Sequence, residues 1–557
     1  MGGLTPHALG LHRALRVVDP LVRPLLDLLP ARRLAAAVNV SDLRDAAKLR
    51  AHKMVFDYLD AGADDEITLR RNKDALSAVE LHPRVLAGLS PPLDVSTRVF
   101  GRSLRLPFFP APTAGSAMFH RDGERGVARA AAERGAMYCL STMGTTSPRA
   151  VASALPRDHP KLFQLYVWRD RGLVRDLLAQ AKESGFHALA LTVDLTWYGN
   201  RERDLRNGFT VPPAYTWAQT VEAVKRPAWT WDFLANEEYA YAALDVAAEA
   251  RAKRRRAASS RPPLQHSAAD ERHLEEPESE PPLPTDRRAQ VSFIRDAFDP
   301  SFDWDDAEWL CEEWGDRGPV ALKGVMRPED AARAVERGFD AVWVSNHGGR
   351  QLETAPATAD VLPAIREALG GFDAWADAKD AEEEVWREYH ASIERASERR
   401  REGAPERDDP ERNDPERNEE SNARRSYAAY AARASRAARD AAPSVATSRK
   451  TGAVVELVAD SGVQRGTDIL KLLALGADGV AIGKACLYGL CAGGEAGAGR
   501  AMDLLAAELE RAMGLAGVGT VREARRANAG LARRRGASAR DFPDPGARGR
   551  GYGGGIF

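Results

Sequence analysis

The chain has 557 residues, enough for one large barrel with additions or for about two or three average domains. Charged residues make up 29% of the chain, yet the net formal charge is only -2, so the composition favours no nucleic-acid partner. The four cysteines are scattered without CxxC or metal-ligand spacing, which indicates reduced core residues of an intracellular protein and no metal site.

Residues 1–40 are an N-terminal extension with arginines among leucines and alanines. Such a segment is typical either of a weak organelle-targeting signal or of an amphipathic helix that packs on the rest of the protein, and Asp19 and Asp27 count against the signal. No run of about 18 apolar residues occurs, so the sequence predicts no membrane-spanning helix. We expect a location in the cytoplasm or in an organelle, either mitochondrion or peroxisome, with attachment to a membrane surface left open.

Eight short apolar runs rich in branched residues are the main structural signal in the rest of the chain. Near-continuous apolar runs are typical of parallel strands that are covered on both faces. The predicted strands are Leu106–Ala114, Met137–Met143, Leu162–Val167, Ala188–Asp194, Pro319–Val325, Ala341–His347, Val454–Gly462 and Gly479–Lys484.

Helix-length segments separate most of these strands, for example Gly126–Arg134 and Pro328–Arg337, where apolar residues recur three and four positions apart. Eight β-α units in one chain predict the α/β class and a closed (β/α)8 TIM barrel, with an open parallel sheet as the alternative. We place the barrel domain at residues 41–525, after an N-terminal helical region and before a C-terminal tail at 526–557.

Two segments interrupt the alternation of strands and helices. Residues 250–290 begin with the basic run Lys253–Arg256 and continue through a Pro-, Glu- and Ser-rich stretch, and residues 376–450 are highly charged. Neither segment has enough apolar surface to offset the entropy of ordering, so we predict two disordered insertions. The basic run fits a solvated charge cluster better than a nucleic-acid patch.

Three tryptophans lie between the fourth and fifth predicted strands, at Trp217, Trp229 and Trp231. They could either seek a membrane surface or pack against the barrel. Packing is favoured, because aromatic side chains carry a large area that is stabilised by burial.

Polar residues collect at the carboxyl ends of the predicted strands, where TIM barrels carry their active sites. A single Ser, Thr, Lys or His at a strand end is usually a cap or a structural residue, but eight such endings at one rim indicate a site. The residues concerned are Pro112, Thr113, Ala114, Ser141, Gln164, Tyr166, Thr192, Asp194, Lys323, Ser345, His347, Arg350, Asp460, Ser461, Gly462, Gly483 and Lys484.

This rim has the groups that a flavin needs. Hydrogen-bonding side chains for the ring edge are available at Ser141, Gln164 and Thr192. A fixed cation such as Lys323 would stabilise the negative charge of a reduced ring. For a phosphate, backbone N–H groups and positive charges are available at Gly462, Gly483, Lys484 and Arg465.

The same rim has the groups that an oxidisable anionic substrate needs. A carboxylate is best held by an arginine fork, for which Arg350 and Arg201 are the candidates. The imidazole of His347 can accept the proton that is released in oxidation. Asp194 can hold that imidazole and stabilise its charged form.

Several stretches resemble the FMN-dependent 2-hydroxy-acid oxidase and dehydrogenase family, which includes glycolate oxidase, lactate oxidase and mandelate dehydrogenase. The most specific stretch is Val344–Leu352, with the sequence VSNHGGRQL, and the resemblance spans residues 41–525 apart from the insertions. The other matching stretches are Phe56–Glu66, Ala111–Ala114, Phe163–Val167, Leu191–Asp194, Arg201–Asp204, Leu322–Gly324 and Arg465–Asp468.

The resemblance implies FMN as the cofactor and a role for each matched position. His347 would be the catalytic base, with Asp194 as its partner and Lys323 beside the flavin. The substrate-binding residues would be Tyr58, Tyr166, Arg201 and Arg350. The flavin would be contacted by Pro112, Thr113, Ala114, Ser141, Gln164, Thr192, Lys323 and Ser345, and its phosphate and ribityl chain by Asp460, Ser461, Gly462, Val463, Gln464, Gly483 and Lys484.

The implied activity is oxidation of a small L-2-hydroxy acid, lactate- or glycolate-like, to the 2-oxo acid. The final electron acceptor would be oxygen, a quinone or a cytochrome, and the enzyme would be a homotetramer. The segments Ser141–Met143 and Asp460–Gly462 resemble the lactate and mandelate dehydrogenase branch, which favours lactate-sized or larger substrates, whereas Ala114 is the type found in oxidases.

Three positions depart from the family pattern. Gln464 and Lys484 stand where the family usually has arginine, and Asn200 replaces the usual first arginine of the pair before Glu202. Because lysine lacks the bidentate fork of arginine, phosphate binding is expected to be weaker or rearranged.

Two other functions stay open at this point. One is a different FMN barrel enzyme, such as an isomerase of a phosphorylated substrate, which would not need two arginines beside a histidine. The other is a barrel that has become a non-catalytic scaffold, with the charged insertions as binding elements.

Overall fold

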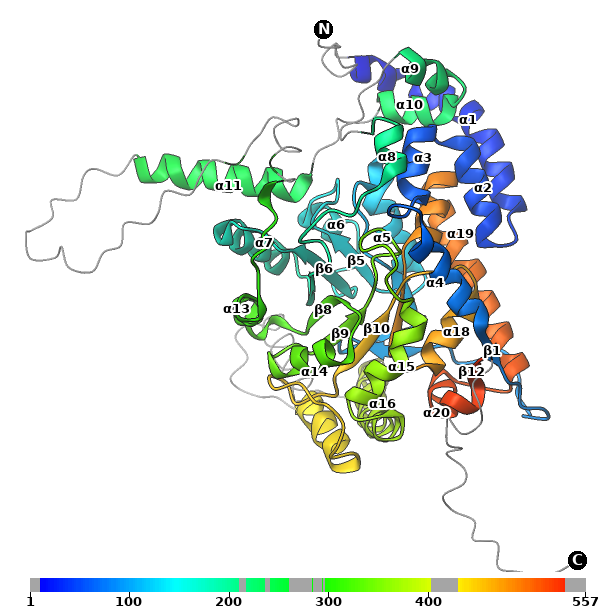
Figure 1. The fold of residues 1–557 in the computed structure, drawn as a ribbon, viewed down its shortest axis with the longest axis vertical. Helices are drawn as coiled ribbons and strands as arrows, with labels where there is room; N and C mark the ends of the chain where they lie inside the picture. The colour runs from blue at the N-terminus through cyan, green and yellow to red at the C-terminus, as the bar shows by residue number, and fades with distance from the viewer. Residues whose placement is uncertain are drawn as a thin grey trace, which may run out of the picture.

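The computed structural model describes residues 11–209, 217–235, 241–259, 283, 293, 296–401 and 429–535. Its centre is a sheet of eight strands in the order β4-β11-β10-β9-β8-β7-β6-β5, in which every pairing is parallel. The end strands β4 and β5 contact each other, which closes the sheet into a barrel surrounded by helices (Figure 1). The predicted TIM barrel is therefore confirmed.

All eight predicted strands are present in the barrel; seven are shorter than predicted, and β6 has the predicted length but begins one residue earlier. Their residues are almost entirely buried, because helices cover the outer face and side chains fill the interior. The strands are β4 Phe108–Pro110, β5 Tyr138–Ser141, β6 Lys161–Tyr166, β7 Ala188–Thr192, β8 Val320–Val325, β9 Ala341–Val344, β10 Glu456–Ala459 and β11 Gly479–Ile482.

Helices alternate with the strands, and the two predicted examples are confirmed. Pro328 occupies the first turn of α14, where its missing N–H costs no hydrogen bond. The helices that follow the successive strands are α5 Gly123–Glu133, α6 Pro148–Ser153, α7 Arg171–Glu183, α13 Trp304–Trp314, α14 Pro328–Glu336, α15 Thr358–Ala368, α18 Gly466–Ala474 and α19 Lys484–Ala516.

The chain before the barrel is helical, as predicted. The helices are α1 Leu11–Ala36, α2 Val40–Arg50, α3 Lys53–Asp60 and α4 Ile67–Ala78. The Asn39 side chain caps α2 by accepting from the Asp42 N–H, and α2 packs along α19. Among the described residues, none of the helices has both the length and the apolar character needed to cross a bilayer.

The C-terminal region continues in ordered structure past residue 525. Helix α20 (Val521–Leu531) leads into strand β12 (Ala532–Arg534), which pairs antiparallel with β1 (Val79–Leu81). This pairing ties the end of the described chain to the segment that precedes the barrel. The domain limits at 40/41 and 525/526 stay a prediction.

The segment between β7 and β8 contains α8 Glu202–Arg206, α9 Trp217–Val224, α10 Pro227–Ala235 and α11 Ala242–Ser259. Trp229 is 1% exposed and donates to the Met118 carbonyl after β4, so its predicted packing on the barrel is confirmed. Trp231 donates instead to Asp19 of α1, and the Trp217 side chain lies outside the described residues. Disorder was predicted from residue 250, but 250–259 belong to α11, where Arg251 binds Asp170 and Asp176. Most of 260–290 lies outside the described residues.

The prediction of disorder is also wrong for the described parts of 376–450. Helix α16 (Phe372–Arg401) and a helix at 429–441 pack on each other through Trp386, Tyr389 and Tyr430. Sequence composition hid this order because the apolar residues are few and are concentrated on one face of each helix. Residues 402–428, which include two consecutive copies of the sequence DPERN at 409–418, lie outside the described residues.

The start of α16 closes the amino-terminal end of the barrel with buried charges. Lys379 lies 3.4 Å from Glu456 and 3.6 Å from Asp478, and Arg366 donates to Asp478 at 2.9 Å. Trp375 also donates to Asp478, whose side chain is fully buried. A buried carboxylate needs such partners to remain charged, so α16 is part of the barrel structure.

Candidate functional site

The loop that follows β9 carries the candidate base at the mouth of the barrel. His347 has a φ of 57°, and Gly348 and Gly349 follow at 68° and 72°. A side chain at Gly349 would come within 2.5 Å of the Leu69 nitrogen, so only glycine lets α4 approach this loop. The His347 N–H donates to Ser345 Oγ and the Gly348 N–H to Ser461 Oγ, which fixes the loop.

His347 and Asp194 form a pair, as predicted. His347 Nδ1 lies 2.9 Å from Asp194 Oδ1, at the end of β7. Burial lowers the pKa of His347 below its ordinary value, and the charge of Asp194 offsets this only in part. Burial raises the pKa of Asp194, but the charges of His347 and Lys323 outweigh it, so that carboxyl has a lowered pKa. The lowered pKa of His347 favours the neutral imidazole, which can accept a proton.

Two arginines lie beside this pair. The guanidinium carbons of Arg350 and Arg201 lie 5.0 and 5.9 Å from the centre of the Tyr58 ring. Burial and the charge of Arg201 lower the pKa of Arg350 to about 10. Within the described residues neither arginine forms a salt bridge, and Arg201 Nε is buried without a partner. Asp204 lies close enough for its charge to act on both arginines but forms no ion pair with either, so two cations without a direct ion pair lie near the imidazole, where an anion can bind.

Tyrosines line the same pocket. Tyr58 from α3 stacks on Phe209 at 4.5 Å, and Tyr166 at the end of β6 is 8% exposed. Burial and the charge of Asp194 raise the pKa of Tyr166, so its hydroxyl stays protonated and can donate.

The predicted flavin-edge residues form a continuous hydrogen-bonded chain across three strands. Ser141 Oγ donates to Gln164 Oε1 at 3.0 Å, and Gln164 Nε2 donates to Thr192 Oγ1 at 2.9 Å. All three side chains are at most 2% exposed. Ser141 lies opposite Gln164 in the sheet, and Thr192 lies opposite Tyr166, which is two residues beyond Gln164 and on the same face of its strand.

Lys323 on β8 is the buried cation of the site. Its ammonium donates to Ser345 Oγ at 3.1 Å and lies 3.8 Å from Asp460, and the side chain is 5% exposed. The Asp460 carboxylate is thus close enough to Lys323 for an ion pair but too far away for a hydrogen bond. Such a lysine can stabilise additional negative charge that arises close to it.

Pro112, Thr113 and Ala114 extend from β4 at the same rim. Thr113 and Ala114 are partly exposed, and the Gly115 N–H donates to the Met143 carbonyl across to the next strand. This contact aligns the loop after β4 with the loop after β5.

The loop after β10, predicted to bind the phosphate, contains two residues in the left-handed backbone region. Ser461 and Gly462 have φ values of 77° and 91°, and a Cβ on Gly462 would lie 2.8 Å from the Asn72 carbonyl oxygen. Asp460 accepts from Trp343 and from Ser461. Val463 is buried, while the N–H groups of Gln464 and Arg465 both donate to Asp468.

The two cations predicted for the phosphate have other partners. Arg465 is paired with Glu508 at 3.1 Å. Lys484 donates to the carbonyls of Asp60 and Ala61 at 2.7 and 3.1 Å, and Arg350 shares the Ala61 carbonyl. Burial and the charge of Arg350 lower the pKa of Lys484. Next to it, Gly483 faces open space, with Ala111 Cβ at 4.0 Å as its nearest neighbour.

FMN fits these residues. The buried hydrogen-bonding groups of Ser141, Gln164 and Thr192 suit the edge of the flavin ring. The Lys323 ammonium suits a ring that gains negative charge on reduction, and the open space at Gly483 suits backbone contacts to the rest of the cofactor. The phosphate end departs most from the prediction, because Lys484 also ties α3 to the barrel.

Sequence reasoning missed several residues that shape this site. The Asn346 and Asn72 amides donate to each other at 2.7 and 2.9 Å, and Gln351 donates to the Asp194 carbonyl. These residues lay inside or near matched stretches, but their partners could not be read from the sequence. Tyr241 comes from the long segment after β7, and its pKa is raised by burial and by Tyr58.

Fold and site together define a flavin-dependent barrel enzyme. The sequence profile of the FMN-dependent dehydrogenase family matches residues 47–378 and 431–530, and the chain belongs to this family. L-lactate dehydrogenases of Chromohalobacter salexigens and Xanthomonas campestris are each 32% identical, over 87% of this chain and 93 and 94% of their own. These relatives are bacterial and give no support to an organelle location.

Solved structures of similar fold are also enzymes that act on 2-hydroxy acids. A monotopic membrane protein, (S)-mandelate dehydrogenase, is 25% identical with a TM-score of 0.64, over 89% of this chain and 99% of its own. A mandelate oxidase is 26% identical with a TM-score of 0.55, over 88% of this chain and 97% of its own. The protein is thus an FMN-dependent 2-hydroxy-acid dehydrogenase or oxidase, and the family match favours this class over the isomerase and scaffold alternatives.

Proposed function

We propose that this protein oxidises a small L-2-hydroxy acid, lactate-sized or somewhat larger, to the 2-oxo acid with His347 as the base. The observation that carries the proposal is the His347–Asp194 contact of 2.9 Å beside two arginines without salt bridges. Arg201 and Arg350 would hold the substrate carboxylate, and the Tyr166 hydroxyl would donate to the substrate oxygen.

The protein's own groups direct the proton. Because Nδ1 of His347 faces Asp194, its N–H donates to the carboxylate and the lone pair remains on Nε2. Nε2 would accept one proton of the substrate, and Asp194 would stabilise the resulting imidazolium. Bound FMN supplies the acceptor for the two electrons. Ser141, Gln164, Thr192 and Lys323 would hold its ring, and Pro112–Ala114 and the loops at Asp460–Gln464 and Gly483 would hold the rest.

The test is anaerobic mixing of the purified yellow protein with a panel of L-2-hydroxy acids, followed by reoxidation with oxygen or with a quinone. We expect lactate or a larger 2-hydroxy acid to bleach the flavin absorbance. A protein that binds FMN but is bleached by no member of the panel would contradict the proposed substrate class. The rates of reoxidation decide between an oxidase and a dehydrogenase. A homotetramer is proposed from the family resemblance and is measured by light scattering.

The dependence of kcat/KM on pH should show that His347 acts as a neutral imidazole. Because the pKa of His347 is lowered, kcat/KM should fall on the acid side only below the ordinary histidine value of about 6.5. Asp194→Asn removes the charge that raises this pKa, so the acid limb should move to lower pH and the maximum should fall at least about tenfold. Asp204→Asn, which changes a carboxylate beside the arginines, is the control and should leave the limb in place.

Lys323→Met should lower the flavin midpoint potential by tens of millivolts, because the ammonium stabilises negative charge at the reduced ring. Equilibrium reduction against a reference dye measures this potential. Lys161→Met is the matched control, since Lys161 is also a buried lysine but lies at the start of β6. Equal potentials in the wild type and Lys323→Met would show that Lys323 does not stabilise the reduced flavin.

A further inference from the structure

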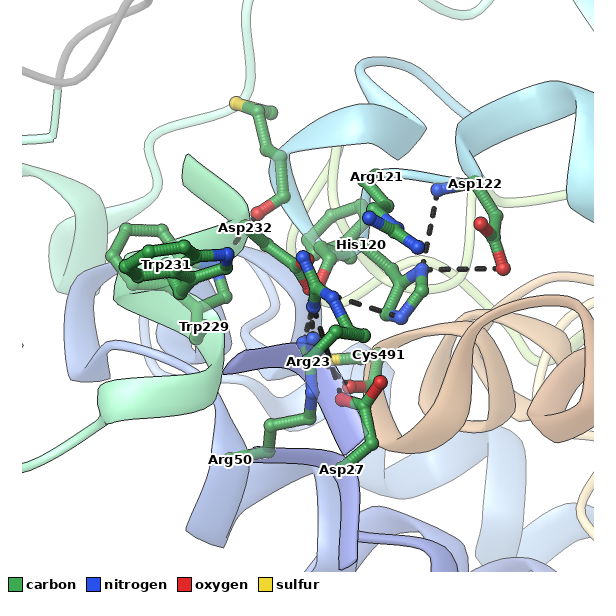
Figure 2. Close-up of polar contacts among 12 residues, drawn as sticks. Arg23, Asp27, Arg50, His120, Arg121, Asp122, Trp229, Trp231, Asp232 and Cys491 are labelled. Carbon is green, nitrogen blue, oxygen red and sulfur yellow. Dashed lines mark hydrogen bonds and ion pairs between the residues drawn. The ribbon is translucent and has the colours of Figure 1, made fainter. Parts of the chain in front are cut away.

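Helix α1 packs on the protein through its charged side. Arg23 is 8% exposed and its guanidinium binds Asp232 on α10 at 2.5 Å, while Arg50 binds the other oxygen of the same carboxylate. Asp19 accepts from Arg23 at 3.0 Å and from Trp231 at 2.6 Å. Figure 2 shows this group of buried charges between α1, α2 and α10.

The opposite side of α1 is apolar and faces outward. Val17, Leu21, Leu25, Leu28 and Leu29 are 79, 77, 77, 51 and 59% exposed. Positions 17, 21, 25 and 28 are three or four residues apart, so they form one stripe along the helix. We call this stripe, together with Leu29, the α1 outer face. An ordinary surface helix has the reverse arrangement, with its leucines buried.

The charges that border the α1 outer face are positive. Arg32 and Arg33 are exposed at the carboxyl end of the stripe, whereas Arg16 donates to the Ala235 carbonyl of α10 on the inner side. The acids of the described part of α1, Asp19 and Asp27, both pair with Arg23 on the inner side. Exposed leucines that end at two exposed arginines match the boundary between acyl chains and anionic headgroups.

We propose that the α1 outer face binds an anionic lipid surface, with its leucines in the acyl boundary and its arginines at the headgroups. This surface is independent of the barrel mouth. A second copy of the chain fits the charges less well, since Asp19 and Asp27 already pair with Arg23 and the stripe would offer no acid to Arg32 and Arg33. In Figure 1, α1 lies with α9 and α10 at one end of the molecule, where it is accessible to a flat surface.

The experiment is sedimentation of the full-length, FMN-loaded protein with phosphatidylcholine vesicles that contain or lack phosphatidylglycerol. We expect binding that needs the anionic lipid and weakens with salt. The triple variant Leu21→Gln, Leu25→Gln, Leu28→Gln should bind at least about tenfold more weakly, with unchanged flavin absorbance. Val85→Gln, Leu86→Gln, Leu515→Gln is the matched control, because these side chains are 82, 101 and 73% exposed outside α1.

Three results would overturn the proposal. They are no binding of the wild type to anionic vesicles at low salt, equal binding by the two triple variants, and vesicle binding that is unaffected while the α1 variant changes the oligomeric state in light scattering. The last result would identify a second copy as the occupant. None of these readouts depends on turnover, so a failure of the proposed substrate would be seen separately.

Discussion

His347→Gln should keep bound FMN and lose about 10²- to 10⁴-fold in the rate of anaerobic flavin reduction by the 2-hydroxy acid. Glutamine can still form hydrogen bonds near Asp194 and Ser345, but it cannot accept a proton at neutral pH. Single-turnover stopped-flow absorbance at the flavin band measures this rate directly.

The control is His82→Gln, because His82 is exposed and lies outside the site. This variant should reduce its flavin at the wild-type rate. If His347→Gln is bleached as fast as His82→Gln, the base must be another group. Loss of flavin from His347→Gln would instead indicate that the loop after β9 has rearranged, and His347→Asn would then be compared.

Arg350→Met should lower kcat/KM by about 10²- to 10³-fold, because removing one member of a buried charge pair costs about 2–5 kcal/mol and each tenfold corresponds to about 1.4 kcal/mol. Arg350 and Arg201 are the two arginines proposed to hold the substrate carboxylate, and the loss of Arg350 leaves that carboxylate with Arg201. The dissociation constant of the 2-oxo acid, followed by the flavin spectrum, should rise in parallel.

Arg350→Lys should lie between the wild type and Arg350→Met, since lysine keeps the charge but loses the planar fork. Arg206→Met is the control, because Arg206 is an arginine at the nearby α8 whose side chain is 72% exposed. Unchanged affinity for the 2-oxo acid in Arg350→Met would show that the carboxylate is bound elsewhere.

The barrel could be predicted because its strands carry their own signal. Runs such as Ala188–Thr192 are buried on both sides, so their apolar composition is continuous and local. The rim residues could be predicted for a related reason, since the carboxyl ends of parallel strands must meet at one edge. Thus Ser141, Gln164 and Thr192 come together once the strands are placed.

Features that depend on partners distant in the sequence could not be predicted. Lys484 binds the carbonyls of Asp60 and Ala61, more than 400 positions away, so its sequence position alone suggested the phosphate. The composition of 376–450 suggested disorder because its many charged residues outweigh the few apolar residues, such as Trp386 and Tyr389, through which α16 packs. Similarly, nothing in the leucines of α1 reveals that the helix turns them outward.

The buried charges at the base of the barrel bear on how the chain can be shortened. The family profile stops at residue 378 and resumes at 431, yet Lys379 and Glu382 belong to the cluster around Asp478 and Glu456. A deletion that begins after residue 378 would remove the Lys379 ammonium and leave the buried carboxylates of Glu456 and Asp478 without it. A shortened enzyme should therefore keep α16 and the helix at 429–441, and residues should be removed from this insertion only within 402–428.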